Sequence, residues 1–383
     1  MKIGIICYPT YGGSGVVATE LGKNLASKLG HEVHFITYDQ PTRLDFFDEN
    51  IFYHKVDIRT YPLFKYPPYE LALTSKMVEV ALAEKLDVLH AHYAIPHASA
   101  AYTAKQILAK KGIDMPVVTT LHGTDVTLVG KDDSFEPVVA FSIDESDCVT
   151  SVSESLKKET YEYFDLTKDI KVIPNFVDLD RFTKHKKDHF KTAICPNGEK
   201  LLVHVSNMRE VKRADDALEV FKRVREKMPC KLLMVGDGPE RAKLEEKCAE
   251  LRTCADVRFL GKIAEVEEIL SVADLYLMPS EKESFGLAAL EAMACQVPVV
   301  SSNAGGIPEV NIHGLTGMMS EVGDVDDMAK NALHILDDAN LPYYKENALK
   351  QAQQFSIEKV CPLYEDIYKE AIAKSKEKFQ LKG

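Results

Sequence analysis

The sequence predicts an α/β protein made of two doubly wound, parallel-sheet domains that face each other across a cleft. Short β-branched runs alternate with amphipathic helical segments along nearly all of the 383 residues. The alternation is interrupted once, near residues 174–182, and starts again at Leu201. At roughly 150 residues per domain, and with 45% hydrophobic residues, the chain can form two buried cores.

The first half of the chain predicts six strands and four helices. The strands are expected at Lys2–Cys7, Val33–Tyr38, Val88–Ala91, Val117–Leu121, Cys148–Ser151 and Lys171–Ile173. The helices are expected at Val16–Leu29, Tyr69–Glu84, Ala98–Lys111 and Ser153–Phe164. Strands that are each followed by a helix indicate a parallel sheet covered on both faces.

The second half repeats this pattern. Strands are expected at Leu201–Ser206, Lys231–Val235, Val257–Leu260, Leu275–Met278 and Val299–Ser301. Helices are expected at Ala214–Lys227, Glu240–Leu251, Leu287–Ala294, Tyr343–Phe355 and Ile357–Lys374. Because Pro174 ends the strand before it, the domains are predicted to span residues 1–173 and 174–356. No strand follows the last helix, so the segment of about residues 357–383 is expected to pack back onto the first domain.

Composition excludes several classes of protein. The 59 acidic residues outnumber the 47 basic ones and give a net charge of −12, which argues against broad nucleic-acid binding. No apolar run approaches the roughly 20 residues that span a bilayer, and the start of the sequence lacks a signal-peptide pattern. The eight cysteines form no CxxC pair and lie mostly in apolar strands or helices. We therefore expect reduced thiols and a cytoplasmic protein.

The most informative segment is 279–298, PSEKESFGLAALEAMACQVP. Glu283 and Glu291 lie eight residues apart and enclose Phe285-Gly286-Leu287. A glycine at the start of a helix exposes unpaired N–H groups to a bound anion. Glu291 lies one helical turn beyond Leu287 on the same face, where its carboxylate could accept hydrogen bonds from the two hydroxyls of a ribose.

This segment resembles the EX7E motif of the retaining glycosyltransferases of family 4, which have the GT-B fold. Five further motifs of that family follow the same order: Phe176–Asp178, Ser206–Arg213, Val235–Pro239, Phe259–Gly261 and Ser302–Val310. The resemblance covers the whole second domain. It implies that this domain binds a UDP-sugar and that the first domain binds the acceptor.

The resemblance also implies roles for single residues of the donor site. Lys212 is expected to hold the diphosphate, with Arg209 as its partner because Asn207 stands where the family usually has arginine. Glu283 is expected to bind sugar hydroxyls rather than attack carbon. Phe285, Gly286, Leu287 and Glu291 are expected around the nucleotide, and the backbone after Gly261 is expected to contact the uracil.

No metal and no cofactor is expected, because Lys212, Arg209 and helix N-termini would meet the charge of the diphosphate. The triplets Asp178-Leu179-Asp180 and Asp324-Val325-Asp326 resemble metal-binding DxD motifs. The first lies in the linker between the domains, and the second has the form of a helix N-cap.

Near the N-terminus, Gly12-Gly13-Ser14-Gly15 lies between a strand and a helix, where backbone amides can bind an anion. In the family, this loop lies under the donor diphosphate and beside the acceptor, so Gly13 is expected at the donor. The spacing Gly13-x-Gly15-x-x-Ala18 also mimics a dinucleotide fingerprint. However, four residues separate Cys7 from Gly12, and this distance disfavours a dehydrogenase.

His122 follows a strand expected to end at the cleft, and the family has a histidine near the donor sugar here. It is therefore counted with Lys212, Arg209 and Glu283 among the catalytic candidates. From strand alternation, we expect at most one of His90 and His92 to face the cleft. A zinc site could be formed by His90, His92, His97 and His122, but it lacks a carboxylate or thiol at ligand spacing.

Several longer blocks resemble one branch of the family, whose members transfer GlcNAc from UDP-GlcNAc to L-malate at the start of bacillithiol biosynthesis. A neutral, hydroxyl-rich pocket at a helix N-terminus suits small carboxylates, and Ser14, Tyr93, Thr120 and Thr124 are the candidates to line it. A homo-oligomer is compatible with the sequence. The alternatives are a lipid or sugar acceptor, a UDP-sugar epimerase, and a non-catalytic module that binds UDP-sugars.

Overall fold

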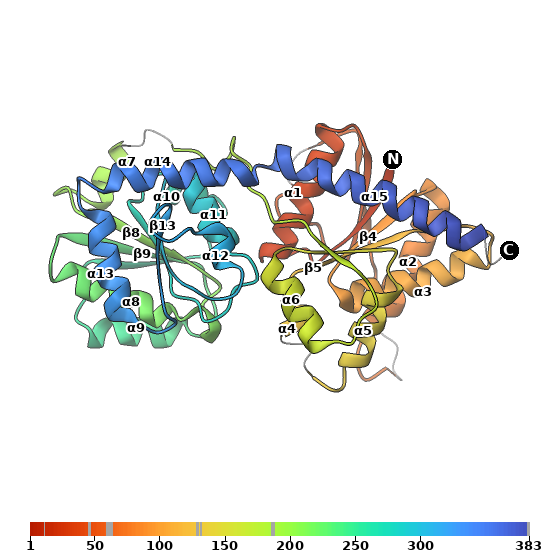
Figure 1. The fold of residues 1–383 in the computed structure, drawn as a ribbon, viewed down its shortest axis with the longest axis horizontal. Coiled ribbons are helices and arrows are strands. Elements are labelled where there is room, and N and C mark those ends of the chain that lie inside the picture. The colour runs from red at the N-terminus through yellow and green to blue at the C-terminus, as the bar shows by residue number, and fades with distance from the viewer. Residues whose placement is uncertain are drawn as a thin grey trace. The chain divides into compact units, whose positions relative to one another are not determined.

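The computed structural model describes residues 1–380, apart from residues 11, 45–46, 59–63, 128–129, 131 and 185–187. The chain divides into two compact domains (Figure 1). The N-terminal domain comprises Met1–Asn175 and Ile357–Gly383, and the C-terminal domain comprises Phe176–Ser356. The division falls two residues after the boundary expected from Pro174, and the last helix belongs to the N-terminal domain.

The N-terminal domain is built on a seven-stranded parallel sheet of order β3-β2-β1-β4-β5-β6-β7. Its strands are β1 (Lys2–Ile6), β2 (Glu32–Thr37), β3 (Ile51–Lys55), β4 (Val88–His92), β5 (Val117–Leu121), β6 (Cys148–Ser151) and β7 (Ile170–Val172). The strand order reverses between β1 and β4. Loops at the carboxyl ends of strands beside such a reversal are the usual ligand site of a doubly wound sheet.

Helices cover both faces of this sheet. They are α1 (Gly13–Ser27), α2 (Tyr69–Glu84), η1 (Ala94–Ala98), α3 (Ser99–Ala109), α4 (Thr124–Thr127), α5 (Glu136–Glu145), α6 (Glu154–Tyr163) and α15 (Ile357–Gln380). One core joins α2 and α3 to the sheet and includes Leu89 of β4. The neighbouring residue, His90, lies on the opposite face, where its ring contacts Tyr364 and Tyr368 of α15.

The C-terminal domain has a six-stranded parallel sheet of order β10-β9-β8-β11-β12-β13. The strands are β8 (Lys200–Val205), β9 (Cys230–Val235), β10 (Val257–Gly261), β11 (Leu275–Met278), β12 (Val299–Ser302) and β13 (Gly317–Ser320). The helices are α7 (Asp188–Ile194), η2 (Glu210–Lys212), α8 (Ala214–Arg225), α9 (Arg241–Glu250), α10 (Val266–Leu270), α11 (Leu287–Ala294), α12 (Ile307–Val310), α13 (Val325–Leu336), α14 (Leu341–Ala352) and η3 (Gln353–Phe355). Its main core packs α8, α13 and the sheet together.

The expected strands are all present, and none of their ends differs from the expected position by more than one residue. The sheets also contain β3 and β13, which the sequence did not predict, and both are edge strands. All eight cysteines are free, and only Cys254 is exposed. Within the described ranges, no helix is both long enough and apolar enough to cross a bilayer.

Candidate functional site

In the C-terminal domain, a charged pair lies where β8 and β11 end. The Lys212 ammonium donates to Glu283 Oε1 at 2.6 Å. Ser280 Oγ donates to the same oxygen at 3.0 Å. The Lys212 and Glu283 side chains are 23% and 13% exposed, so the pair is shielded from bulk water but open to a ligand. Two of the predicted catalytic residues thus lie in direct contact.

A buried histidine shapes the loop that leads to Lys212. His204 Nδ1 donates to the carbonyl of Leu277 at 3.0 Å, so its Nε2 accepts from Ser206 Oγ at 2.8 Å. Ser206 Oγ in turn accepts from the backbone N–H of Met208 at 3.2 Å. Burial lowers the pKa of His204 to about 4. The imidazole is therefore neutral at pH 7 and keeps this arrangement of donors and acceptors.

Close backbone packing fixes Glu283 from its other side. The N–H of Gly306 donates to the carbonyl of Glu283 at 2.9 Å. A Cβ at Gly305 would lie 2.1 Å from that carbonyl oxygen. The loop of residues 302–310 therefore needs glycine at this point to approach the backbone of Glu283.

Helix α11 begins beside the charged pair. Gly286 precedes it with φ +92°, a conformation that favours glycine. Leu287, the first residue of α11, is half-buried, and Glu291 is 9% exposed. Phe285 is buried against Phe355, with ring centroids 5.6 Å apart. Because its ring belongs to the core, the backbone of Phe285 is the part available to a ligand.

Two further donor candidates of this domain lie after β8 and at the end of β10. Arg209 is exposed and immediately precedes η2. Its carbonyl accepts from the N–H of Lys212 at 2.9 Å. Gly261 ends β10, and its carbonyl accepts from the N–H of Gly236 at 2.7 Å, which ties together the loops after β9 and β10.

In the N-terminal domain, hydroxyl groups gather at the carboxyl ends of β1 and β4. The Tyr93 hydroxyl donates to Ser14 Oγ at 2.8 Å. Tyr93 has φ +89° and leaves β4 with its N–H bonded to the carbonyl of Thr120. Ser14 is the second residue of α1, after Gly13, and Thr124 is exposed at the start of α4. Burial raises the pKa of Tyr93 to about 12, so this group of side chains is neutral.

His122 lies beside these hydroxyls. It is half-buried, and its ring centroid lies 5.2 Å from that of Tyr93. Its Nε2 is 2.8 Å from Nδ1 of His92. Burial lowers the pKa of His122 to about 3, so the ring is neutral at physiological pH.

Strand alternation does not separate His90 from His92, so the argument behind that expectation is wrong. Residues two apart on a strand point to the same face, and the two rings lie side by side with centroids 4.2 Å apart. Both are fully buried. Only His92 bonds to His122, whereas His90 bonds to Thr120 and Tyr368.

Similarity to known proteins agrees with this architecture. Residues 11–181 match Glycosyltransferase Family 4, and residues 185–354 match Glycosyl transferases group 1. The chain is 46% identical to N-acetyl-alpha-D-glucosaminyl L-malate synthase from Bacillus anthracis over 379 residues, 98% of each chain. It belongs to glycosyltransferase family 4.

Solved structures show the same fold. Sucrose-phosphate synthase from Thermosynechococcus elongatus has a TM-score of 0.79 at 22% identity, over 97% of this chain and 99% of that chain. Anabaena HepE, solved in complex with UDP and glucose, has a TM-score of 0.79 at 19% identity, over 96% and 99%. The family 4 enzyme described here therefore has the GT-B fold.

One candidate of the acceptor group is placed away from the others. Thr120 is fully buried, and its hydroxyl contacts His90 Nε2 and Thr150 Oγ1, each at 2.7 Å. This hydroxyl is engaged in the interior under α15 and has no exposed surface for an acceptor. The predicted contact of Thr120 with an acceptor is therefore corrected to a structural role.

The sequence interpretation missed Asp125. Its carboxylate accepts from the N–H groups of Ala94 at 3.1 Å, Gly123 at 3.0 Å and His122 at 3.3 Å. Burial raises its pKa to about 6 against the effect of these bonds. Asp125 thus joins the loop that carries Tyr93 to the loop that carries His122. An acidic residue in the first turn of α4, directly after His122-Gly123-Thr124, was the available signal.

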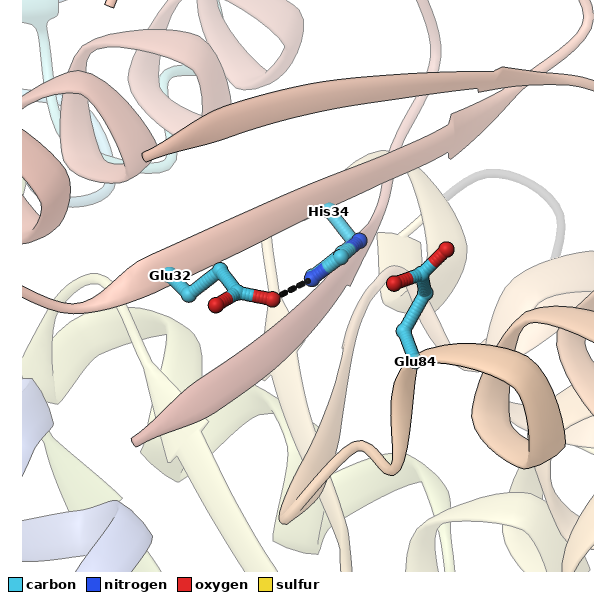
Figure 2. Close-up of side chains that lie close together, drawn as sticks. All are labelled: Glu32, His34 and Glu84. Carbon is cyan, nitrogen blue, oxygen red and sulfur yellow. Dashed lines mark hydrogen bonds and ion pairs between the residues drawn. The ribbon is translucent and has the colours of Figure 1, made fainter. Parts of the chain in front are cut away.

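Within the described residues, one group of three could hold an ion: Glu32, His34 and Glu84 (Figure 2). Lys2 already pairs with Glu32 at 2.6 Å, and His34 Nδ1 bonds to His54 at 2.9 Å. Glu32 also begins β2, at the edge of the sheet opposite the expected ligand site.

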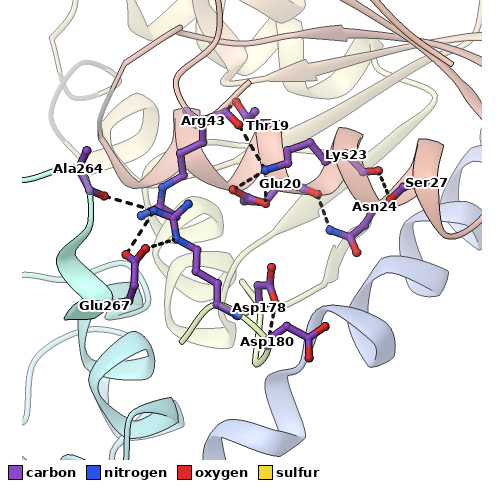
Figure 3. Close-up of polar contacts among 12 residues, drawn as sticks. Thr19, Glu20, Lys23, Asn24, Ser27, Arg43, Asp178, Asp180, Ala264 and Glu267 are labelled. Carbon is purple, nitrogen blue, oxygen red and sulfur yellow. Dashed lines mark hydrogen bonds and ion pairs between the residues drawn. The ribbon is translucent and has the colours of Figure 1, made fainter. Parts of the chain in front are cut away.

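Both DxD triplets have local structural roles. Asp178 Oδ1 accepts from the N–H of Asp180 at 2.9 Å (Figure 3). It also accepts from the N–H of Arg181 at 3.2 Å. Asp324 caps α13 by accepting from the N–H of Asp327 at 3.0 Å. Each triplet therefore stabilises a turn or a helix end.

Proposed function

We propose that this glycosyltransferase moves N-acetylglucosamine from UDP-GlcNAc to the hydroxyl of L-malate, with retention of the α configuration. The observation that carries the proposal is the 46% identity to the L-malate synthase of Bacillus anthracis over 98% of both chains. The alignment covers 379 residues and therefore includes both domains. The eight free cysteines support a cytoplasmic enzyme.

The C-terminal cluster would bind the donor. Lys212 and the exposed Arg209 are both cationic and would bind the diphosphate. The N-terminus of α11 at Gly286 would add its positive dipole end. Glu283 is 13% exposed beside Lys212, where its carboxylate could accept hydrogen bonds from hydroxyls of the sugar. Glu291 would accept the ribose hydroxyls from one turn inside α11.

The N-terminal cluster would bind the acceptor. The hydroxyls of Ser14 and Thr124 and the amides at the start of α1 are neutral donors, and the Tyr93 hydroxyl holds Ser14 Oγ in place. Such donors suit the small carboxylates of malate, because they do not impose the dense positive charge that a phosphate selects. Gly13 would serve both substrates at the N-terminus of α1.

The contacts of Glu283 support substitution on one face of the sugar. Its Oε1 is held by the Lys212 ammonium and by Ser280 Oγ, which makes the carboxylate a poor nucleophile. The bond from the anomeric carbon to the β-phosphate oxygen would break as a bond to the malate hydroxyl oxygen forms. The hydroxyl proton would pass to the departing phosphate oxygen. Lys212 would stabilise the charge that builds on that oxygen.

The decisive experiment is UDP release from UDP-GlcNAc across a panel of L-malate, D-malate, L-lactate, glycerol 3-phosphate and buffer alone. We expect rapid release only with L-malate, together with an α-linked product identified by NMR. Equal rates with all acceptors would contradict the proposal. Release of ManNAc would instead identify an epimerase, and UDP binding without turnover would identify a non-catalytic module.

A lipid acceptor is the nearest competing function within the family. Sedimentation with liposomes of anionic lipid tests it, since such enzymes present a basic amphipathic surface to the membrane. We expect the protein to stay in the supernatant. Cosedimentation together with glycosylation of a lipid acceptor would favour that function over malate.

A further inference from the structure

The bond between His92 and His122 constrains where the protons of these rings lie. The two nitrogens, Nδ1 of His92 and Nε2 of His122, are 2.8 Å apart. A neutral imidazole has one N–H and one lone pair. Both rings are neutral at pH 7, because burial holds their pKa values well below the usual range. One ring must therefore donate and the other must accept.

The surroundings of His92 decide which ring donates. Its Nε2 is buried and has no hydrogen-bond partner in the described parts of the chain. If His122 donated, the proton of His92 would lie on that nitrogen as an orphaned N–H. If His92 donates, the orphan is only a lone pair. Orphaned buried N–H groups are the rarest unsatisfied groups in proteins, so the second arrangement is favoured.

The other groups around the pair are consistent with this choice. His97 donates through Nδ1 to the carbonyl of His92 and also leaves a buried, unpaired Nε2. His90 lies against the His92 ring but bonds to Tyr368 and Thr120. The carboxylate of Asp125 accepts the backbone N–H of His122, and the Tyr93 hydroxyl donates to Ser14. None of these contacts occupies the imidazole nitrogens that join His92 to His122.

We propose that His92 is a positioning residue, which donates to His122 Nε2 and so fixes the proton of His122 on Nδ1. His122 then presents a neutral N–H to an oxygen of a bound substrate and does not act as a base. No hydrogen bond to Nδ1 of His122 occurs in the described parts of the structure, so this N–H is available. The inference rests on the proposed function for its substrate, but not for the position of the proton.

The proton position is measured by long-range ¹H–¹⁵N correlation on the full chain labelled with ¹⁵N-histidine. The spectrum of His122→Gln identifies the signals of His122. In the unliganded wild type between pH 6 and 8, we expect a protonated Nδ1 and an unprotonated Nε2. A protonated Nε2 would overturn the proposal, whatever acceptor the enzyme uses.

Three variants separate positioning from packing. His92→Leu removes the donor, and we expect the His122 signals to shift and kcat/KM to fall about tenfold, the effect of one neutral hydrogen bond. His92→Asn places an N–H near the position of Nδ1 and should restore kcat/KM to within about threefold. His90→Leu is the matched control, an equally buried imidazole on the same strand, and should leave the His122 signals in place.

The outcomes distinguish this inference from the proposed function. If a folded His92→Leu protein keeps the His122 signals and kcat/KM of the wild type, His92 only packs in the core and does not position His122. A protonated Nδ1 in an enzyme that ignores malate would contradict only the acceptor. If His92→Leu does not fold, the wild-type spectrum still decides the proton position.

Discussion

Lys212 gives the strongest test at the scale of single residues, because its ammonium holds Glu283 at 2.6 Å in the unliganded protein. If it meets the leaving phosphate, its contribution grows as charge builds in the transition state. We expect Lys212→Ala to lower kcat about a hundredfold or more with a modest change in UDP affinity.

Steady-state kinetics and calorimetric UDP binding on the same variant measure these two quantities. Lys243→Ala, which removes an exposed lysine paired with Glu240 in the same domain, is the control and should behave as wild type. A near-normal kcat for Lys212→Ala would exclude the role at the leaving group. A raised KM at normal kcat would show that Lys212 only anchors UDP.

Glu291 is predicted to act on binding rather than on chemistry. It lies one turn inside α11, 9% exposed, and its proposed partner is the ribose, far from the anomeric carbon. Loss of such a charge-assisted bond costs roughly 1.5–3 kcal/mol. We expect Glu291→Ala to raise KM for UDP-GlcNAc more than it lowers kcat, and an unchanged KM would remove Glu291 from the nucleotide site.

The candidate residues show what sequence reasoning can and cannot reach. Lys212 and Glu283 could both be expected at the donor site because a motif fixes their order and each follows a strand, but their direct contact was not predicted. Thr120 could not be excluded, because its hydroxyl bonds to His90, whose ring packs against a helix more than 200 residues later. Asp125 was missed because its partners are backbone N–H groups, one of which belongs to Ala94 on a different loop.

At the scale of elements, the close approach of two loops makes a prediction for Gly305. Its φ is +57°, and an added Cβ would lie 2.1 Å from the carbonyl of Glu283. The loop must then shift the backbone that carries the donor-site carboxylate. We expect Gly305→Ala to raise KM for UDP-GlcNAc about tenfold or more, since overpacking displaces backbone.

Gly314 offers a matched control for that substitution. Its φ is also positive, +77°, but nothing lies within 4 Å of an added Cβ. Gly314→Ala should therefore cost about 1 kcal/mol of stability from backbone strain alone and leave the kinetics unchanged. Equal kinetic effects in the two variants, measured with thermal unfolding of each, would show that backbone strain and not loop packing is responsible.

The strands that the sequence predicted differ in burial from the strands that it missed. The central strands β4 and β5 are buried at every position, so their apolar runs stand out in the sequence. The edge strand β3 has three exposed residues and no buried one among IFYHK, so it lacks that signal. The other missed strand, β13, begins with Gly317, where an added Cβ would lie 1.9 Å from the carbonyl of Val299, and glycine weakens a strand pattern.

At the scale of the whole molecule, the charge distribution predicts a reaction that needs no divalent ion. Lys212, Arg209 and the start of α11 are expected to meet the diphosphate, and both DxD triplets are engaged in local caps. Activity should therefore survive excess EDTA. Loss of activity in EDTA, together with its recovery when Mg²⁺ or Mn²⁺ is added back, would contradict this assignment.

The two domains are also predicted to respond differently to acid. Burial lowers the pKa of His90 and His122 to about 3 and of His97 to about 4, and that of His92 well below its usual value. All four lie in the N-terminal domain. The unfolded chain binds protons at these histidines below about pH 6.5, whereas the folded domain does not, so stability falls as the pH falls toward 3–4.

Asp125 opposes this trend in the same domain. Its pKa of about 6 lies above the value in an unfolded chain, so the folded domain binds the extra proton and gains stability as the pH falls from 6 to 4. In the C-terminal domain, the lowered pKa of His204, about 4, is opposed by the raised pKa of Asp216. Each such group contributes up to about 1.4 kcal/mol per pH unit.

Near pH 5, the N-terminal domain should therefore lose stability steeply as the pH falls, and the C-terminal domain much less. Hydrogen exchange read by mass spectrometry at pH 7, 6 and 5, corrected for intrinsic exchange rates, reports the two domains separately. We expect protection in β4 and β5 to fall steeply while protection in β8 and β11 stays nearly constant. A parallel fall in both sheets would mean that the buried histidines of the N-terminal domain do not control its stability in acid.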